Sequence, residues 1–222
     1  MATRGSVSCA MTPELVIFDC DGVLVDTEHA TNAVIAQNLQ SYGLSITPMQ
    51  THEYFAGGTM QSVGEEATRR GAVLPGDWLD EIYGQVFARL RQGVTVIEGV
   101  WNLLNRLENT QIAIASNGPV AKMEITLKPS GLWDKFAGRI YSGHDHGPKP
   151  APDMLLKIME DAKVSTTSTV MIDDMPSGCR AAQAAGIRCF GYVADGDPNR
   201  IEGTGAIPVT CLAAIGDMLN LH

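Results

Sequence analysis

The fold is decided by residues 15–28, which read LVIFDCDGVLVDTE. Four apolar residues lead directly into Asp19 and Asp21, and Gly22 follows. A short apolar run bounded by turn-forming residues is typical of a strand buried on both faces, as in a parallel sheet. Two carboxylates two residues apart point to the same side of the backbone. They predict a site for a hard cation such as Mg²⁺ beside a sharp turn at Gly22, whereas an Asp-rich turn without a ligand is the alternative for this motif alone.

Similar apolar runs recur at 112–115, 170–172 and 187–193, each bounded by polar residues. Stretches with a helical pattern lie around and between them, at 100–107, 120–130, 152–162 and 176–185. This alternation of strand and helix predicts an α/β protein with a doubly wound parallel sheet. Ligands of such sheets bind at the carboxyl ends of the strands.

One interval breaks the alternation. Between about residues 29 and 94 the pattern contains no convincing buried strand, and it predicts helices at 30–42, 60–70 and 78–91. We therefore expect a helical domain inserted into the core, with hinges at Thr27-Glu28 and at 93–99. The predicted core comprises residues 1–28 and 95–222, of which 1–12 form a flexible tail, and the insert comprises residues 29–94.

Composition excludes several classes of function. The 222 residues contain 25 acidic and 16 basic side chains and carry a net charge of −9, which argues against a general binder of nucleic acid. No apolar run approaches the roughly 18 residues needed to span a bilayer, and no signal peptide is recognisable. The five cysteines form neither a CxxC pair nor a zinc spacing. These features predict a soluble, cytoplasmic protein with no membrane partner. The sequence does not decide between a monomer and a small homo-oligomer.

Two later segments offer groups that bind anions. Ser116-Asn117-Gly118 follows the second apolar run and supplies a hydroxyl, an amide and open backbone N–H groups before a helix, which suits an anion, although a plain helix cap is the alternative. Lys149 stands between two prolines that restrict its backbone and reduce the entropy lost on binding. An exposed surface lysine is the alternative there.

A second acidic pair, Asp173-Asp174, closes another apolar run. Adjacent carboxylates repel each other unless a cation offsets them, so this pair also indicates a metal. The alternative is that one of the two caps the helix that begins near Pro176.

The order of these elements, Asp19-x-Asp21, then Ser116, then Lys149, then an acidic pair, resembles the haloacid dehalogenase superfamily. The resemblance covers essentially the whole chain after residue 13 and implies a Rossmann-like core with an α-helical cap inserted after the first strand. The stretch 21–28 is most similar to the phosphoglycolate phosphatase and β-phosphoglucomutase branch.

The resemblance implies a Mg²⁺-dependent phosphatase that hydrolyses a small phosphorylated metabolite, a sugar phosphate or a phosphoglycolate-like ester. Asp19 matches the nucleophile that becomes an aspartyl phosphate, and Asp21 matches the general acid and base. Lys149 matches the cation that bridges the phosphate and the nucleophile. The other matched groups bind phosphate (Ser116, Asn117 and Gly118) or the metal (Asp19, the main-chain carbonyl of Asp21, Asp174, and Asp173 as a supporting ligand).

Two alternative functions have sequence features against them. Sugar phosphomutases of this branch have a histidine four residues after the hinge threonine, where this chain has Thr31, and an arginine shortly after the cap glycine, where it has Gly57-Gly58-Thr59-Met60.

A signalling receiver domain is also doubly wound and phosphorylated on aspartate. It lacks the Asp-x-Asp-Gly arrangement and the cap-sized insert.

Substrate choice should depend on the cap, because the core contacts the phosphoryl group that all substrates share. The candidate specificity segments are 54–61 and 89–91. The run SNGP at 116–119 with Lys122-Met123 is similar to bacterial phosphatases that act on 6-phosphogluconate and related sugar phosphates.

His144 and His146 form a His-x-His segment that could bind a transition metal, although solvated loop histidines are the better account. His29 follows the hinge and could face the substrate, with surface placement as the alternative. Met175 stands where the branch often has serine, so the hydrogen bond of that serine is absent.

Overall fold

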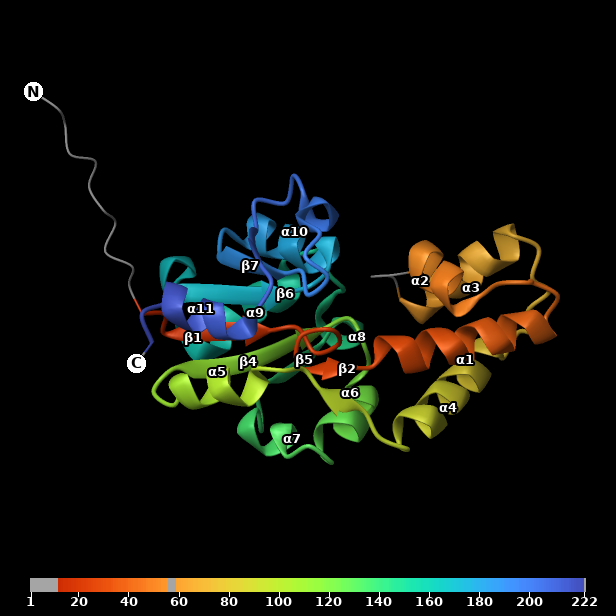
Figure 1. Ribbon diagram of the computed structural model, residues 1–222, viewed down its shortest axis with the longest axis horizontal. Helices are drawn as coiled ribbons and strands as arrows, with labels where there is room; N and C mark the ends of the chain where they lie inside the picture. Colours follow the sequence, from red (N-terminus) through yellow and green to blue (C-terminus); the bar gives the residue numbers. More distant parts are fainter. Residues whose placement is uncertain (1–11, 56–58, 222) are drawn as a thin grey trace, which may run out of the picture.

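The computed structural model describes residues 12–55 and 59–221, so all but the last residue of the predicted tail lies outside it. A parallel six-stranded sheet forms the core, in the order β5-β4-β1-β6-β7-β8 (Figure 1). This is the predicted doubly wound α/β architecture. Its strands are β1 (Leu15–Phe18), β4 (Gln111–Ser116), β5 (Ile140–Ser142), β6 (Thr169–Asp173), β7 (Arg188–Tyr192) and β8 (Ile207–Val209).

Strand β1 lies in the middle of the sheet, between β4 and β6, with Phe18 in register with Ile114 and Ile172. All four of its side chains are buried, and they alternate between the two faces. Val16 and Phe18 belong to one apolar cluster, and Leu15 and Ile17 belong to another. Both faces of β1 are therefore covered, which is why its sequence is an unbroken apolar run.

Helices cover both faces of the sheet. The cluster that includes Phe18 also contains residues of α5 (Val100–Arg106), α6 (Val120–Leu127), α7 (Leu132–Lys135) and α11 (Leu212–Met218). The opposite cluster contains residues of α9 (Asp153–Ala162) and α10 (Pro176–Ala185). Three short helices complete the core: α8 (Gly143–His146), η1 (Thr166–Ser168) and η2 (Pro198–Ile201).

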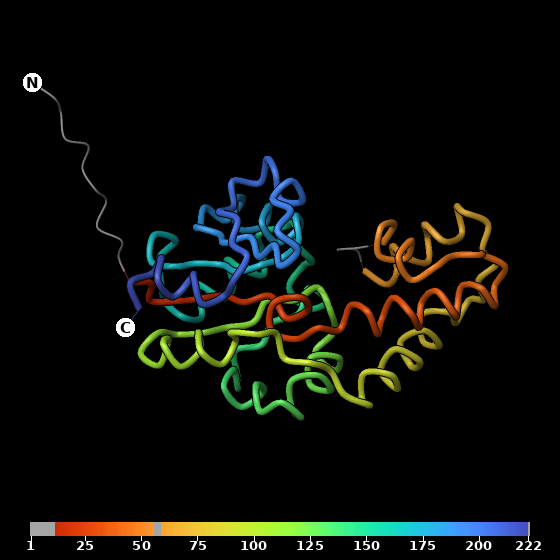
Figure 2. The backbone as a smooth tube through the Cα atoms, in the orientation of Figure 1, coloured from red at the N-terminus to blue at the C-terminus, as the bar shows by residue number. Residues whose placement is uncertain are grey.

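The segment after β1 folds into a helical lobe beside the sheet (Figures 1 and 2). It contains α1 (Glu28–Ser41), α2 (Pro48–Phe55), α3 (Met60–Arg69) and α4 (Trp78–Leu90). Their buried side chains form a third apolar cluster. Within it, the Trp78 indole N–H donates to Asn38 Oδ1 at 2.7 Å, so a buried polar pair ties α4 to α1. Helix α2 was not among the predicted helices.

A small antiparallel ribbon joins the helical lobe to the core. Its strands are β2 (Val25–Asp26), which ends just before the predicted hinge at 27–28, and β3 (Thr95–Val96), which lies within the predicted hinge at 93–99. The chain therefore leaves the core and returns to it side by side. No helix within the described residues is long and apolar enough to cross a membrane.

Candidate active site

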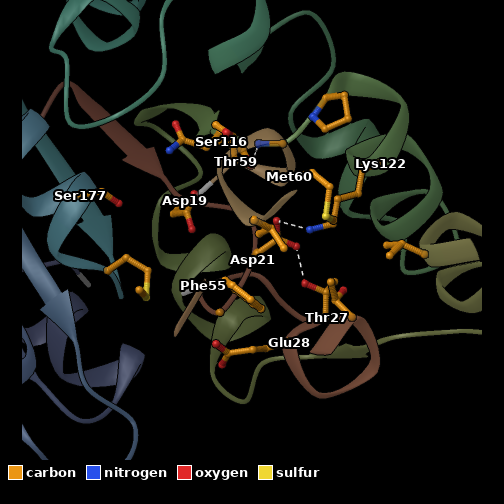
Figure 3. Close-up of a pocket in the computed structure, with 18 of the residues that line it drawn as sticks. Asp19, Asp21, Thr27, Glu28, Phe55, Thr59, Met60, Ser116, Lys122 and Ser177 are labelled. Carbon is orange, nitrogen blue, oxygen red and sulfur yellow. Dashed lines mark hydrogen bonds and ion pairs between the residues drawn. The ribbon is translucent and has the colours of Figure 1, made fainter. Parts of the chain in front are cut away.

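Three neighbouring strands deliver the predicted site residues to one edge of the sheet. Asp19 follows β1, Ser116 ends β4, and Asp173 ends β6. Because β4, β1 and β6 are adjacent and parallel, their carboxyl ends meet. Together with Lys149, which precedes α9, these residues line a single pocket (Figure 3). The opposite wall of the pocket belongs to the helical lobe of α1 to α4, which is called the cap below.

Lys149 lies at the centre of this edge. Its ammonium is 2.6 Å from Asp19 Oδ1, 2.7 Å from Asp173 Oδ2 and 3.0 Å from the carbonyl oxygen of Ala115, so all three of its N–H donors have acceptors. Its side chain is only 4% exposed. Burial works to lower the pKa of Lys149, but Asp173 and Asp19 outweigh it and raise that pKa, so the lysine stays cationic.

The carboxylates around Lys149 carry more negative charge than the lysine offsets. Burial raises the pKa of Asp19 to about 7, with Lys149 opposing the shift. Burial, followed by the nearby Asp19 and Asp173, also raises the pKa of Asp174. A group of carboxyls with raised pKa values binds a divalent cation readily, because the added positive charge favours the ionised forms.

The arrangement of oxygens fits such a cation. Asp19, Asp173 and Asp174 offer ligand atoms that all lie within 4.8 Å of one another. Asp174 Oδ1 is buried and has no hydrogen-bond partner, which is costly for a polar atom unless a ligand occupies it. Asp173 differs, because its two oxygens accept from Lys149 and from the Met175 backbone N–H at 2.9 Å.

Gly22 permits this close packing. Its φ is +84°, and a Cβ on it would stand 2.4 Å from Asp174 Oδ2. Any other residue would both strain the backbone and displace the carboxylate. The sharp turn predicted at this position therefore exists, and it also leaves room for Asp174.

Asp21 is held by two partners on opposite oxygens. Thr27 Oγ1 donates to Asp21 Oδ1 at 2.5 Å, and Lys122 Nζ lies 2.7 Å from Oδ2 (Figure 3). Burial pushes the pKa of Asp21 upward, but Lys122 and Thr27 outweigh it and keep that pKa below its usual value. The sequence reasoning did not assign Lys122 to the site. The available signal was its place in the first turn of the helix that follows SNGP.

Part of the Ser116-Asn117-Gly118 segment holds other residues of the site in place. The Asn117 side chain accepts the Lys149 backbone N–H at 2.7 Å and donates to the Lys149 carbonyl at 3.0 Å. It therefore fixes the loop that carries the lysine. Ser116 Oγ accepts the Gly118 N–H at 3.1 Å and lines the pocket, as does Gly118.

The cap contributes a mixed wall to the same pocket. From the predicted specificity segment 54–61, Phe55, Thr59 and Met60 line it, whereas Gly57 and Gly58 lie outside the described residues. The second predicted segment, 89–91, does not line this pocket. Helices α1, α3 and α4 supply the other cap residues: Thr31, Asn32, Ile35, Val63, Tyr83 and Val86.

None of the three histidines singled out in the sequence lines the pocket. The His29 side chain is 94% exposed and lies 3.8 Å from Asp26. His144 and His146 belong to α8, and His146 packs its ring against Tyr141. Among the described residues, the carboxylate group on the sheet edge is the one candidate metal cluster, and it contains none of these histidines.

Taken together, the fold and the site define a capped α/β hydrolase. The chain belongs to the haloacid dehalogenase-like hydrolases, because the sequence profile of that family matches residues 16–192. This membership agrees with the resemblance seen in the motifs. It disagrees with the receiver-domain alternative.

Named relatives and solved structures agree with the assignment. The chain is 26% identical to the 6-phosphogluconate phosphatase of Escherichia coli K12 over 185 residues, which cover 82% of this chain and 83% of the relative. It is 27% identical to a Pseudomonas putida phosphoglycolate phosphatase over 190 residues, covering 81% and 69%. A haloacid dehalogenase-like protein of unknown function from Agrobacterium tumefaciens is 32% identical, with a TM-score of 0.80 and coverage of 92% and 98%.

Proposed function

We propose that this protein is a Mg²⁺-dependent phosphatase that hydrolyses a small phosphomonoester through an aspartyl phosphate on Asp19. The observation that carries the proposal is the contact of Lys149 with both Asp19 and Asp173 beside the unpartnered Asp174 oxygen. It supports the proposal because a buried carboxylate, a fixed cation and oxygens suited to a metal lie together on one edge of the sheet. The names of the two relatives support a phosphorylated sugar, sugar acid or glycolate as substrate.

The residues present fit a bound Mg²⁺. Asp19 and Asp174 would supply carboxylate oxygens and Asp21 its main-chain carbonyl, while Asp173 supports the site by holding Lys149 and the Met175 backbone. When bound, the cation neutralises charge on the phosphoryl oxygens and on the acidic cluster.

The first chemical step belongs to Asp19. One carboxylate oxygen of Asp19 attacks the phosphorus atom, and the bond from phosphorus to the ester oxygen breaks. Lys149 holds the nucleophile at 2.6 Å and offers positive charge to the phosphoryl group as it transfers. The Ser116 hydroxyl and the Asn117 backbone N–H would bind the phosphoryl oxygens, while the Gly118 N–H orients Ser116 by donating to its Oγ at 3.1 Å.

Asp21 moves the proton in both steps. The negative charge of the bound phosphoryl group beside Asp21 raises its pKa, which Lys122 and Thr27 lower in the free site, so that Asp21 takes up a proton from solvent when the ester binds. It gives this proton to the departing ester oxygen, and the substrate leaves as an alcohol. It then takes a proton from the water that attacks the aspartyl phosphate, so the bond from phosphorus to Asp19 breaks and phosphate is released. The contacts from Thr27 and Lys122 fix the Asp21 side chain in the pocket that both reactants must enter.

The substitution Asp19→Asn tests this function. The amide keeps the shape of the side chain but is a poor nucleophile, so phosphate release should fall at least about a thousandfold, as for other nucleophile deletions. The measurement is inorganic phosphate released from a panel of sugar phosphates, phosphoglycolate and nucleotides with Mg²⁺. The matched control is Asp134→Asn, which changes a carboxylate in the short helix α7 outside the pocket. Full activity in Asp19→Asn would contradict the proposal.

A further inference from the structure

The first turn of helix α10 packs directly against the acidic cluster. The Met175 backbone N–H donates to Asp173 Oδ1 at 2.9 Å, and a Cβ on Gly178 would stand only 1.8 Å from Asp173 Oδ2. The Gly178 backbone therefore lies against the carboxylate, and no larger residue fits there. These two contacts hold residues 175–178 at a fixed place beside the candidate metal ligands.

Ser177 carries the one hydroxyl of this turn. It is half-buried and lines the pocket together with Asp19 and Asp174. In Figure 3 the Ser177 hydroxyl oxygen lies on the side that faces Asp19. The hydroxyl has no hydrogen-bond partner among the described residues, so its donor and its two acceptor lone pairs are available to a ligand.

Asp174 gives an independent sign of a ligand beside this turn. It is only 9% exposed, and its Oδ1 has no hydrogen-bond partner. The protein thus leaves a buried carboxylate oxygen and, three residues along the chain, a hydroxyl in the same pocket unsatisfied. This pair fits a hydrated cation, because the cation takes the carboxylate oxygen while its water molecules need hydrogen-bond acceptors.

The order of the strands favours the metal over the phosphoryl group as the neighbour of Ser177. Strand β1, which delivers Asp19, lies between β4 and β6. Ser116, proposed to bind the phosphoryl oxygens, ends β4, whereas α10 follows β6. Ser177 is therefore on the same side of Asp19 as the proposed metal ligand Asp174.

A bound Mg²⁺ would need acceptors on this side. Magnesium demands octahedral coordination and keeps several water molecules, whose protons must be accepted by nearby groups. Both oxygens of Asp173 already accept a hydrogen bond, one from Lys149 and the other from the Met175 N–H. The Ser177 hydroxyl oxygen is the side-chain acceptor of this turn that remains unused.

We propose that Ser177 is a positioning residue for Mg²⁺, whose hydroxyl accepts a hydrogen bond from a water molecule in the hydration shell of the cation. The inference rests on the proposed phosphatase function, because it adds a contact to the metal that this function requires. Ser177 does not touch the ester, so it acts on metal affinity and acts equally for every substrate.

The test measures Mg²⁺ binding by calorimetry to the full-length protein without substrate, so the readout does not depend on turnover. Ser177→Ala should raise the dissociation constant for Mg²⁺ about tenfold, as expected when a partner of a metal-bound group is lost. Ser177→Thr keeps the hydroxyl and should stay within about twofold of the wild-type protein. Ser62→Ala makes the same change in the first turn of α3, at an exposed residue outside the pocket, and should have no effect.

A second titration separates the metal from the phosphoryl group. With Mg²⁺ saturating in each protein, inorganic phosphate should bind equally well to the wild type and to Ser177→Ala. Weaker phosphate binding with an unchanged Mg²⁺ dissociation constant would mean that the hydroxyl binds the anion, and it would overturn the inference.

The inference would also be overturned if Ser177→Ala bound Mg²⁺ as tightly as the wild type, if Ser177→Thr lost as much affinity as Ser177→Ala, or if the wild-type protein bound no Mg²⁺. Failure of the phosphatase function has a different signature, namely phosphate release that is absent from the wild-type protein or unaffected by Asp19→Asn.

Discussion

The two walls of the pocket differ in how their polar groups are satisfied. On the core wall, Lys149 has three acceptors, and both oxygens of Asp173 have donors. On the cap wall, Thr31 has no partner, and Ile35 and Phe55 are apolar. The network around Lys149 is therefore fixed by the protein before any substrate binds, whereas the cap wall has no comparable network of charged partners.

This difference separates two tasks. A preorganised network of charges stabilises a transition state efficiently, because no group has to reorient during the reaction. A wall of mixed polar and apolar side chains that contacts the rest of the substrate selects among ligands by shape and by the groups it can pair. Changes to the network around Lys149 should therefore reduce turnover of every substrate alike, and changes on the cap wall should alter the ranking of substrates.

The largest effect should follow from Lys149→Met. The change leaves Asp19 and Asp173 buried without their cation, which costs about 3–5 kcal/mol of unfolding free energy, and it lowers kcat for all esters by about a thousandfold. Chemical denaturation and phosphate release measure the two effects. Lys157→Met, on the exposed face of α9, should change neither. A loss of activity confined to one substrate would break the distinction between the walls.

A smaller effect should follow from Asp174→Asn. The amide removes a charged ligand oxygen, so the Mg²⁺ concentration for half-maximal activity should rise about tenfold to a hundredfold. Titration of phosphate release with Mg²⁺ measures this shift, and high Mg²⁺ should restore part of the rate. The same factor should apply to every ester. An unchanged Mg²⁺ requirement would show that Asp174 does not hold the metal.

The smallest effect should follow from Met60→Ala on the cap wall. Met60 is half-buried at the start of α3 and lines the pocket near Lys122 (Figure 3). Its loss removes apolar contact with the leaving group, so KM should change by about twofold to fivefold, by a different factor for each ester. Steady-state kinetics on several esters measures this. A uniform fall in kcat would show that the cap wall also takes part in the chemistry.

The fold was largely predictable because its signals are local. An unbroken apolar run such as 15–18 indicates a strand covered on both faces, and the alternation with helices indicates the sheet type. Helix α2 was missed because its segment, PMQTHEYF, buries only Thr51 and Phe55 and so has little apolar periodicity. Strand β5 was missed because it is only three residues long, at the edge of the sheet.

The site was predictable where a side chain follows a strand directly, as Asp19 and Asp173 do. It was less predictable where partners come from distant segments. Lys122 and Asp21 are 101 residues apart, and nothing in either local sequence indicates the pairing. The unpartnered state of Thr31 is equally invisible in the sequence, because it depends on how the surrounding segments pack.

The contact between Lys149 and Asp19 determines how late in synthesis the site can form. The two residues are 130 positions apart, and Asp173 lies a further 24 positions on. A growing chain therefore exposes Asp19 long before Lys149 emerges from the ribosome, and it cannot add β6 beside β1 until later still. Enzymatic activity should thus appear late in synthesis, only after contacts between residues far apart in sequence, such as those of β1 with β6, have formed.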